Sequence, residues 1–176
     1  MKIAIAVVLL CVFAAFSIKV KTQLNAKESP LAALKLGEPM PDFTLPDLSG
    51  KTVKFSEVIR DKKLVMINFW ASWCVPCRLE MPGFEKIYGA KKAEGFTILA
   101  IDEDKERPKL DAYLKEKPVS FPVLVDEDGT IAKQFGIRAF PTTIFVGGDG
   151  KILQVFEEVQ PYPEFWIDRQ LREKKR

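Results

Sequence analysis

"NFWASWCVPCRLEMP", from Asn68 to Pro82, is the stretch that decides the fold of this chain. It begins inside the apolar run "KLVMINFW" (Lys63 to Trp70), which predicts a buried central strand. Beyond the second cysteine, Cys77, apolar residues recur at helical spacing until Gly95, which favours a helix stop. These apolar residues are Leu79, Phe84, Ile87 and Tyr88. Two cysteines therefore lie where a buried strand gives way to a helix.

Strand and helix signals alternate through the rest of the sequence. Residues 96–102 predict a second buried strand, so residues 63–102 form a βαβ unit. A helical turn at residues 56–59 would take Ser56 as its N-cap. The other predicted strands are 42–45, 51–55, 121–126, 142–146 and 151–156, and the other predicted helices are 107–117, 130–136 and 163–176. Together they predict one α/β domain, a mixed central sheet flanked by helices, with an N-terminal and a C-terminal hairpin.

The N-terminus carries an export signal. An uncharged apolar run extends from Ile3 to Ile18, short for a transmembrane helix and long for the core of a cleaved signal peptide. We predict an uncleaved signal-anchor over residues 1–18. Cleavage after Ser17 and lipidation of Cys11 are the alternatives.

The chain beyond this run divides into a linker and one folded domain. The linker is predicted over residues 19–36, which are polar at first and interrupted by Pro30, and the domain over residues 37–176. Each form of the export signal puts that domain outside the cytoplasm, in the periplasm or another extracytoplasmic space. The expected arrangement is a domain held at the cell membrane by a single N-terminal segment.

Composition excludes several kinds of site. Histidine is absent, so a histidine base, a His-ligated metal and a C-x-x-C-H haem attachment are all excluded. The net charge of +3 is too small to indicate a nucleic-acid partner. We expect no metal and no cofactor. Since Cys11 lies in the apolar run, the domain has only Cys74 and Cys77 for thiol chemistry.

Cys74 and Cys77 can hold a metal, staple the fold or exchange electrons. If a helix begins at Cys74, Cys77 follows on the same face, with Cα atoms roughly 5–6 Å apart, as a disulfide requires. The amino end of a helix favours a thiolate, so we expect Cys74 to be the exposed nucleophile and Cys77 the resolving thiol. Pro76 would stiffen the first turn. A structural zinc site would need about four ligands, and the domain offers only these two cysteines. A structural disulfide that closes so short a loop would stabilise the fold little. Both remain as alternatives to redox exchange.

The motifs taken together resemble the thioredoxin superfamily. "NFWASWCVPC" with Pro82 and the later "FPTT" carry this resemblance. The opening "GEPMPDFTLPDLSGKTVKFSE" and the segment "IDEDKERPKLDAYLKEKPVSFPVLVDEDGTIAKQFGI" narrow it to the membrane-anchored extracytoplasmic branch typified by TlpA and ResA. The likeness runs from about Gly37 nearly to the C-terminus. It implies a thioredoxin-like fold with a central insert, and a thiol–disulfide oxidoreductase that works through a Cys74–Cys77 redox disulfide.

The resemblance also implies roles for residues on the cysteine helix and before it. Trp73 stands where the family keeps an aromatic beside the active site, and Pro82 falls where these helices kink. Glu80 matches an acid that this branch carries near the disulfide. It follows Cys77 by three residues on the cysteine face, where we expect a half-buried carboxylate to move protons to and from the resolving thiol. An ordinary solvated glutamate is the alternative. Thioredoxins themselves place a buried aspartate where this chain has Asn68, which cannot titrate.

A second segment, "FPT" at residues 140–142, matches the family's partner-binding backbone. Pro141 takes the position of the cis-proline, and a cis bond of this kind usually serves a site. Phe140 is bulkier than the residues usual before it, and either favours an apolar partner strand or packs against Trp73. Thr142 continues the segment. We expect Trp73, Pro76, Phe140, Pro141 and Thr142 to contact the substrate.

The residues between the cysteines predict the direction of electron flow. Val75 and Pro76 are apolar and uncharged, so we expect a potential nearer the thioredoxin end, about −270 mV, than the oxidising end, about −120 mV. This predicts a reductase of exported proteins, with apocytochrome c as a client by resemblance and a thiol-transferring membrane electron donor. An oxidant or isomerase of the same fold is the main alternative.

Rivals from other classes fit less well. A peroxiredoxin-like peroxidase shares the opening "PDFTLPDLSGKTV" but needs a proline and a hydroxyl before its cysteine that "NFWASWC" lacks. A copper chaperone would need histidine, and a non-catalytic holdase would not need the C-x-x-C pair. A calcium loop at "DEDG" fails because its twelfth position is Ile137.

Overall fold

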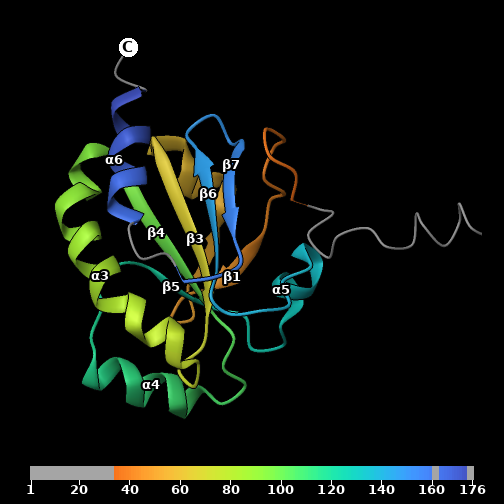
Figure 1. Ribbon diagram of the computed structural model, residues 1–176. Coiled ribbons are helices and arrows are strands. Elements are labelled where there is room, and N and C mark those ends of the chain that lie inside the picture. Colours follow the sequence, from red (N-terminus) through yellow and green to blue (C-terminus); the bar gives the residue numbers. More distant parts are fainter. Residues whose placement is uncertain (1–33, 160–162, 174–176) are drawn as a thin grey trace, which may run out of the picture.

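The computed structural model describes residues 34–159 and 163–173 (Figure 1). Five strands form the central sheet in the order β5-β4-β3-β6-β7, and two more form a separate hairpin. The strands are β1 (Thr44–Pro46), β2 (Thr52–Lys54), β3 (Leu64–Trp70), β4 (Phe96–Asp102), β5 (Val123–Val125), β6 (Thr142–Gly147) and β7 (Ile152–Phe156). β3, β4 and β5 are parallel, and β6 and β7 are antiparallel additions. This mixed sheet confirms the predicted fold class.

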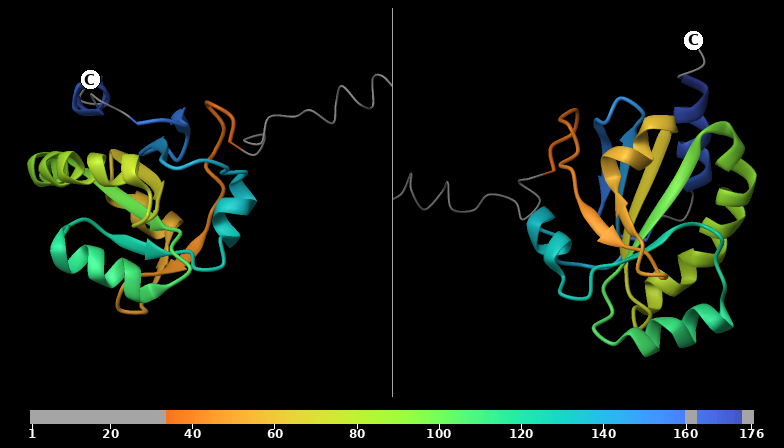
Figure 2. Two further views of the ribbon diagram at one scale, coloured as in Figure 1. Left: turned by 60° about the horizontal axis from the view of Figure 1, so that its bottom comes forward. Right: turned by 180° about the vertical axis from the view of Figure 1, so that it is seen from behind.

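The helices cover both faces of the sheet. They are α2 (Phe55–Val58), α3 (Val75–Lys91), α4 (Arg107–Glu116), α5 (Thr130–Phe135) and α6 (Pro163–Glu173), with 3₁₀ turns at Ile59–Asp61 and Lys92–Glu94. α3, α4 and α6 lie on one side of the sheet and α5 on the other (Figure 1). Seen from behind, the β1–β2 hairpin and α2 lie in front of the sheet (Figure 2). The cysteine-bearing helix is therefore one of a layer of three.

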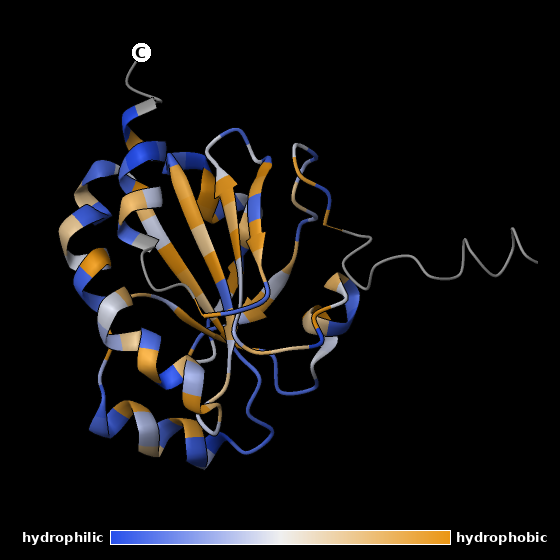
Figure 3. Cartoon of the chain, viewed as in Figure 1, coloured by the Kyte–Doolittle hydropathy of each residue, from blue (hydrophilic) through white to orange (hydrophobic). Residues whose placement is uncertain are grey.

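Alternation along the central strands produces two cores. Successive side chains of a strand point to opposite faces, and both faces of β3 and β4 are covered. From β3, Val65, Ile67 and Phe69 join the core under the hairpin, α2 and α5, whereas Leu64, Met66 and Trp70 join the core under α3, α4 and α6. The central strands are accordingly coloured mostly as hydrophobic in Figure 3. This explains why residues 64–70 are apolar on both faces of the strand, apart from Asn68.

Several element boundaries differ from the prediction. The strand expected over residues 121–126 is only Val123–Val125, because Pro122 has no N–H for a ladder and offers only its carbonyl, to Ala100. The long cysteine helix ends at Lys91, and a 3₁₀ turn leads to Gly95, whose φ of 93° is the left-handed conformation that ends helices. Both hairpins are confirmed, with strands shorter than predicted at the first.

The predicted N-cap at Ser56 is wrong. α2 begins at Phe55 and is capped by Lys54, whose side chain makes no capping hydrogen bond. Ser56 lies inside the turn, and its backbone N–H donates to Asp42 Oδ1 at 2.9 Å. A carboxylate fourteen residues earlier in the chain thus does what a local serine was expected to do.

The described chain begins inside the predicted linker. Leu34 is buried in the core beneath the hairpin, and Gly37 donates its N–H to Ile152 at 2.8 Å. Packing therefore begins at least three residues before the expected boundary at Gly37. The signal-anchor predicted for residues 1–18 lies outside the described residues, as does most of the linker. Among residues 34–159 and 163–173, no helix has the length and hydropathy needed to cross a bilayer.

Candidate active site

The two cysteines lie at the amino end of α3, at the bottom of Figure 1. Their sulfurs are joined at 2.01 Å, with Cα atoms 5.3 Å apart. Cys74 is the N-cap of α3, and the backbone N–H of Cys77 donates to Cys74 Sγ at 3.3 Å. Because the first N–H groups of a helix have no partners within the helix, they are available to stabilise a thiolate on Cys74.

Cys74 is not exposed, contrary to the prediction. It is 5% exposed and Cys77 is 1% exposed. Both sulfurs belong to the core under α3, since the turn between β3 and α3 packs inward. The neighbours Val75 and Pro76 point outward instead. Cys74 is the more accessible of the two, although a client must react with a residue that is almost fully buried.

Apolar residues close to the cysteines in sequence, together with Phe140, form a surface that we call the rim. We define the rim as Trp73, Val75, Leu79 and Phe140, of which the first three are 61%, 56% and 75% exposed. Phe140 is partly buried and meets Trp73 edge-on, with ring centroids 5.9 Å apart. The prediction that Leu79 belongs to the buried face of the helix is wrong. The buried face runs through Cys77, Glu80, Met81, Phe84 and Ile87, which leaves Leu79 in solvent.

The "FPT" segment lies beside the rim. The Phe140–Pro141 peptide bond is cis. Pro141 is buried, and Thr142 opens β6 opposite Phe69 of β3. Thr142 is itself buried, and its hydroxyl donates to the carbonyl of Ala139 at 2.8 Å. The side chain of Thr142 therefore supports the loop from within, and almost no part of Thr142 is exposed to a partner, contrary to the predicted substrate contact.

Glu80 is buried in α3, only 6% exposed, three residues beyond Cys77 on the same helix face. A solvated surface glutamate is therefore excluded, and the proposed proton-transfer role remains a prediction. Pro82 lies inside α3, as the resemblance implied. The buried Asn68 donates its side-chain N–H to Thr143 Oγ1 at 3.0 Å, so it serves as a bond between two strands.

Sequence reasoning missed a group of acids at the carboxyl ends of β4 and β5. Asp104 is 2% exposed, and its Oδ2 accepts the backbone N–H of Ser72 at 2.8 Å. Asp102 Oδ2 accepts the N–H of Asp104 at 3.2 Å. The buried Asp126 accepts three N–H groups at the start of α5, from Thr130, Ile131 and Ala132. The sequence signal that could have identified this group is the run of three acids, Asp102 to Asp104, at the end of an apolar strand.

Two of these acids hold their protons unusually tightly. Burial above all, and then the nearby Asp104 carboxylate, raise the pKa of Asp102 from 3.8 to about 8, against an opposing attraction from Arg107. Burial and then Asp126 raise the pKa of Glu103 from 4.5 to about 9, opposed by Lys133. Both carboxyls are thus mostly protonated at neutral pH, in a region that also holds the active-site turn in place.

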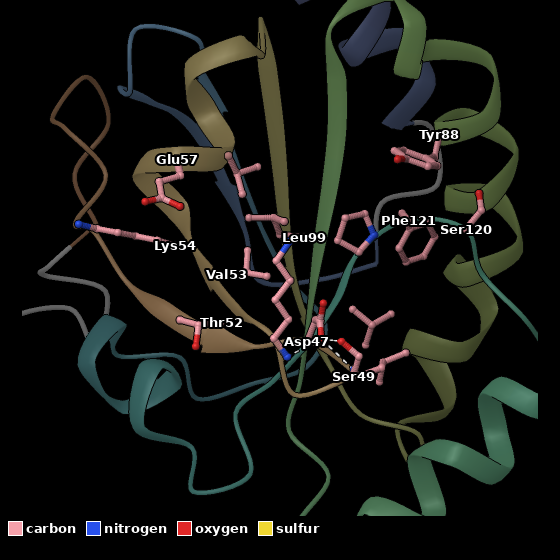
Figure 4. Close-up of a pocket in the computed structure, with 15 residues that line it drawn as sticks. Asp47, Ser49, Thr52, Val53, Lys54, Glu57, Tyr88, Leu99, Ser120 and Phe121 are labelled. Atoms are coloured by element: carbon pink, nitrogen blue, oxygen red, sulfur yellow. Dashed lines mark hydrogen bonds between the residues drawn. The ribbon is translucent and has the colours of Figure 1, made fainter.

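The disulfide does not lie in the cleft shown in Figure 4, which has a volume of about 680 Å³. That cleft is bounded by the β1–β2 hairpin, Tyr88 of α3 and the loop before β5, with Asp47, Lys54 and Phe121 on its walls. None of the described residues predicted for the site lines it. The thiol chemistry therefore takes place outside this cleft, next to the exposed apolar side chains of the rim, as suits a macromolecular substrate.

Comparison with known proteins agrees with this geometry. Residues 36–155 match the model of the AhpC/TSA family. The thiol-disulfide oxidoreductase ResA of Bacillus thuringiensis subsp. konkukian is 34% identical over 121 residues, which are 69% of each chain. ResA of Bacillus subtilis is 30% identical over 134 residues, 76% of this chain and 74% of that protein.

Solved structures point the same way. The crystal structure assigned to thiol:disulfide interchange protein DsbE from Chlorobium tepidum superposes with a TM-score of 0.72 at 30% identity, covering 80% of this chain and 97% of the other. Its fold, a helix-covered mixed sheet, is the one described above. The chain therefore belongs to the AhpC/TSA family of thioredoxin-like proteins and is a thiol–disulfide oxidoreductase homologous to ResA.

Proposed function

We propose that this enzyme is a reductase that acts outside the cytoplasm on the disulfides of exported proteins. The Cys74 thiolate attacks one sulfur of the client disulfide, which breaks that bond and forms a mixed disulfide. The Cys77 thiolate then attacks Cys74 Sγ, releases the client as a dithiol and leaves the Cys74–Cys77 disulfide. The client gains two electrons and two protons, and a thiol-transferring donor in the membrane restores the dithiol.

The observation that carries the direction is the setting of the buried sulfurs. They lie among apolar side chains, with the buried Glu80 on the same helix face and Asp104 bonded to the preceding turn. Burial and neighbouring carboxylates both disfavour a thiolate. A fold that stabilises its reduced form less is the stronger reductant. The uncharged Val75-Pro76 pair adds no stabilising positive charge.

The apolar rim supports a polypeptide client. Exposed large apolar side chains close together on a surface mark a region that another protein covers. Trp73, Val75 and Leu79 would meet apolar residues that flank the client cysteine, while the cis-proline segment offers backbone groups for an extended chain. An unfolded exported protein such as apocytochrome c has both features, and the apolar N-terminal run of the sequence supports an extracytoplasmic setting.

Replacing Leu79 by serine tests the rim. Since Leu79 is 75% exposed, the variant should fold normally and lose apolar contact only with the client, raising KM about threefold to tenfold with little change in kcat. Steady-state reduction of an unfolded disulfide-bonded protein measures both constants. The matched control is Phe165→Ser, which is 73% exposed on α6, the helix whose Asp168 pairs with Lys91 at the carboxyl end of α3. Equal effects of the two substitutions would exclude the rim as the docking surface.

The reduction potential tests the direction. The full-length protein is equilibrated in thiol–disulfide buffers of graded potential, and the fraction of reduced Cys74–Cys77 is read by alkylation and mass spectrometry. We expect a midpoint of about −250 mV or below. A midpoint near about −120 mV would instead make the protein an oxidant or isomerase and refute the proposed reductase.

A further inference from the structure

The bond between Asp104 and Ser72 connects two loops that are far apart in the sequence. Ser72 lies two residues before Cys74, in the turn after β3, and Asp104 lies in the loop after β4. The Ser72 N–H to Asp104 Oδ2 distance is 2.8 Å, and both residues are buried. A carboxylate that accepts a buried backbone N–H makes one of the stronger hydrogen bonds in a protein.

Asp104 is held in place by its own neighbours. Its backbone N–H donates to Asp102 Oδ2 at 3.2 Å, and the two carboxyl groups also face each other. Because the pKa of Asp102 is raised to about 8, Asp102 is mostly protonated at neutral pH and can share its proton with Asp104. The other charged groups around these loops are Glu103, Asp126, Arg107, Lys109 and Lys133.

The turn held by Asp104 determines where Cys74 sits. The N–H of Cys74 donates to Ala71 at 3.1 Å, so the position of Cys74 follows that of the turn. Before the turn, the Trp70 carbonyl accepts the backbone N–H of Glu103 at 2.9 Å. Glu103 and Asp104 belong to the same loop after β4. If the turn moved, Cys74 Sγ would lose its alignment with the Cys77 N–H, now 3.3 Å away.

We propose that Asp104 is a positioning residue for thiol–disulfide exchange: by accepting the Ser72 N–H, its carboxylate keeps Cys74 at the amino end of α3. Asp104 acts through the backbone and not on the reacting sulfurs. Removing the acceptor leaves the Ser72 N–H buried without a partner, and the turn shifts to satisfy it. The thiolate of Cys74 then loses part of its stabilisation from the helix.

The pKa of the Cys74 thiol should shift in opposite directions if Asp104 acts by position or by charge. Deleting a nearby negative charge would by itself lower the pKa of the Cys74 thiol. Displacing Cys74 from the helix end would raise it. We therefore expect Asp104→Ala to raise the thiol pKa and slow attack at neutral pH about tenfold, while Asp104→Asn, which keeps an acceptor oxygen, stays near wild type or reacts faster.

The test is the pH profile of Cys74 alkylation by iodoacetamide in the reduced full-length protein, followed by mass spectrometry of the Cys74 peptide. Circular dichroism melting is recorded for each variant. The control is Asp126→Ala, since Asp126 is equally buried and accepts backbone N–H groups, but from α5. If Asp104→Ala fails to fold, Asp104→Ser takes its place, because its hydroxyl is too short to reach Ser72.

A profile shifted upward in Asp104→Ala (or Asp104→Ser), but not in Asp104→Asn or Asp126→Ala, supports the proposal. An unshifted or lowered profile in Asp104→Ala would overturn it, because charge alone would then account for any effect. An equal upward shift in Asp126→Ala would also overturn it, by showing general loosening. An Asp104→Asn variant that reacts as slowly as Asp104→Ala would also overturn the proposal. It would show that an acceptor oxygen at position 104 is not enough to position Cys74.

Discussion

Cys74→Ser is expected to lower the rate of disulfide exchange by at least about a thousandfold, because a serine hydroxyl neither ionises near neutral pH nor forms a disulfide. The loss should be chemical and not structural. Serine is a good N-cap, so its hydroxyl can accept the Cys77 N–H that Cys74 Sγ accepts now. Reduction of insulin by the dithiothreitol-charged protein measures the rate, and thermal melting verifies the fold.

The matched variant is Cys77→Ser, which keeps the nucleophile and removes the resolving thiol. We expect it to perform the first attack and then accumulate a mixed disulfide between Cys74 and the client, visible as a higher-mass species on a non-reducing gel. Cys11→Ser should leave exchange unchanged. Adducts that accumulate on Cys74→Ser instead of Cys77→Ser would show that the order of attack is reversed.

The protein is expected to lose about 3 kcal/mol of unfolding free energy between pH 5 and pH 8.5, as the unfolded chain gives up protons that the folded chain keeps. Asp102 and Glu103 have pKa values raised to about 8 and about 9, from 3.8 and 4.5. Between about pH 5 and pH 7.5 both carboxyls are mostly protonated when folded and mostly ionised when unfolded. Raising the pH therefore favours unfolding in this window, and the effect levels off above about pH 9.

If each group differed by one full proton, stability would fall by about 1.4 kcal/mol per pH unit for each group. The expected loss of unfolding free energy is well below this limit, because the structure relaxes around a buried charge. The lowered pKa values of Asp42 and Asp47 act in the opposite sense, but only as the pH falls through the acid range below this window. Urea unfolding of the oxidised protein at a series of pH values measures the dependence.

Asp102→Asn isolates the source of this pH dependence. The variant cannot ionise at that position, so its stability should fall less steeply with pH and exceed that of the wild type at pH 8. Glu57→Gln, which changes an exposed carboxylate on α2, is the control and should keep the wild-type slope. A wild-type profile that rises from pH 5 to pH 8, or an Asp102→Asn profile parallel to it, would contradict the assignment.

The sequence by itself determined the order of elements and the chemistry at their junction. Residues 63–70 and 96–102 are mostly apolar on both faces, with Asn68, Thr97 and Asp102 as buried polar exceptions, and this local pattern needs no knowledge of distant contacts. The same holds for Cys74 and Cys77, because a spacing of three brings side chains together on any helix. The C-terminal hairpin was equally local, because Gly148, Asp149 and Gly150 between β6 and β7 are turn residues.

Only the tertiary structure decided which side chains face inward. Leu79 and Glu80 are neighbours on α3, and hydropathy alone favours burying the leucine. The helix is instead oriented by Cys77, Met81 and Phe84, which puts Glu80 inside and Leu79 in solvent. The sequence pattern of α3 cannot show that the acid is buried and the leucine exposed, because all tertiary contacts of the helix together determine which face points inward.

The tertiary structure also decided what holds the reactive turn. Ser72 and Asp104 are 32 residues apart, and they meet only because β3 and β4 are parallel neighbours whose carboxyl ends lie at one edge of the sheet. The burial of Cys74 and the raised pKa values of Asp102 and Glu103 arise at that same edge. Helices and strands are specified by periodicity over a few neighbouring residues. Burial and charge at this site depend instead on how segments that are distant in the sequence pack together.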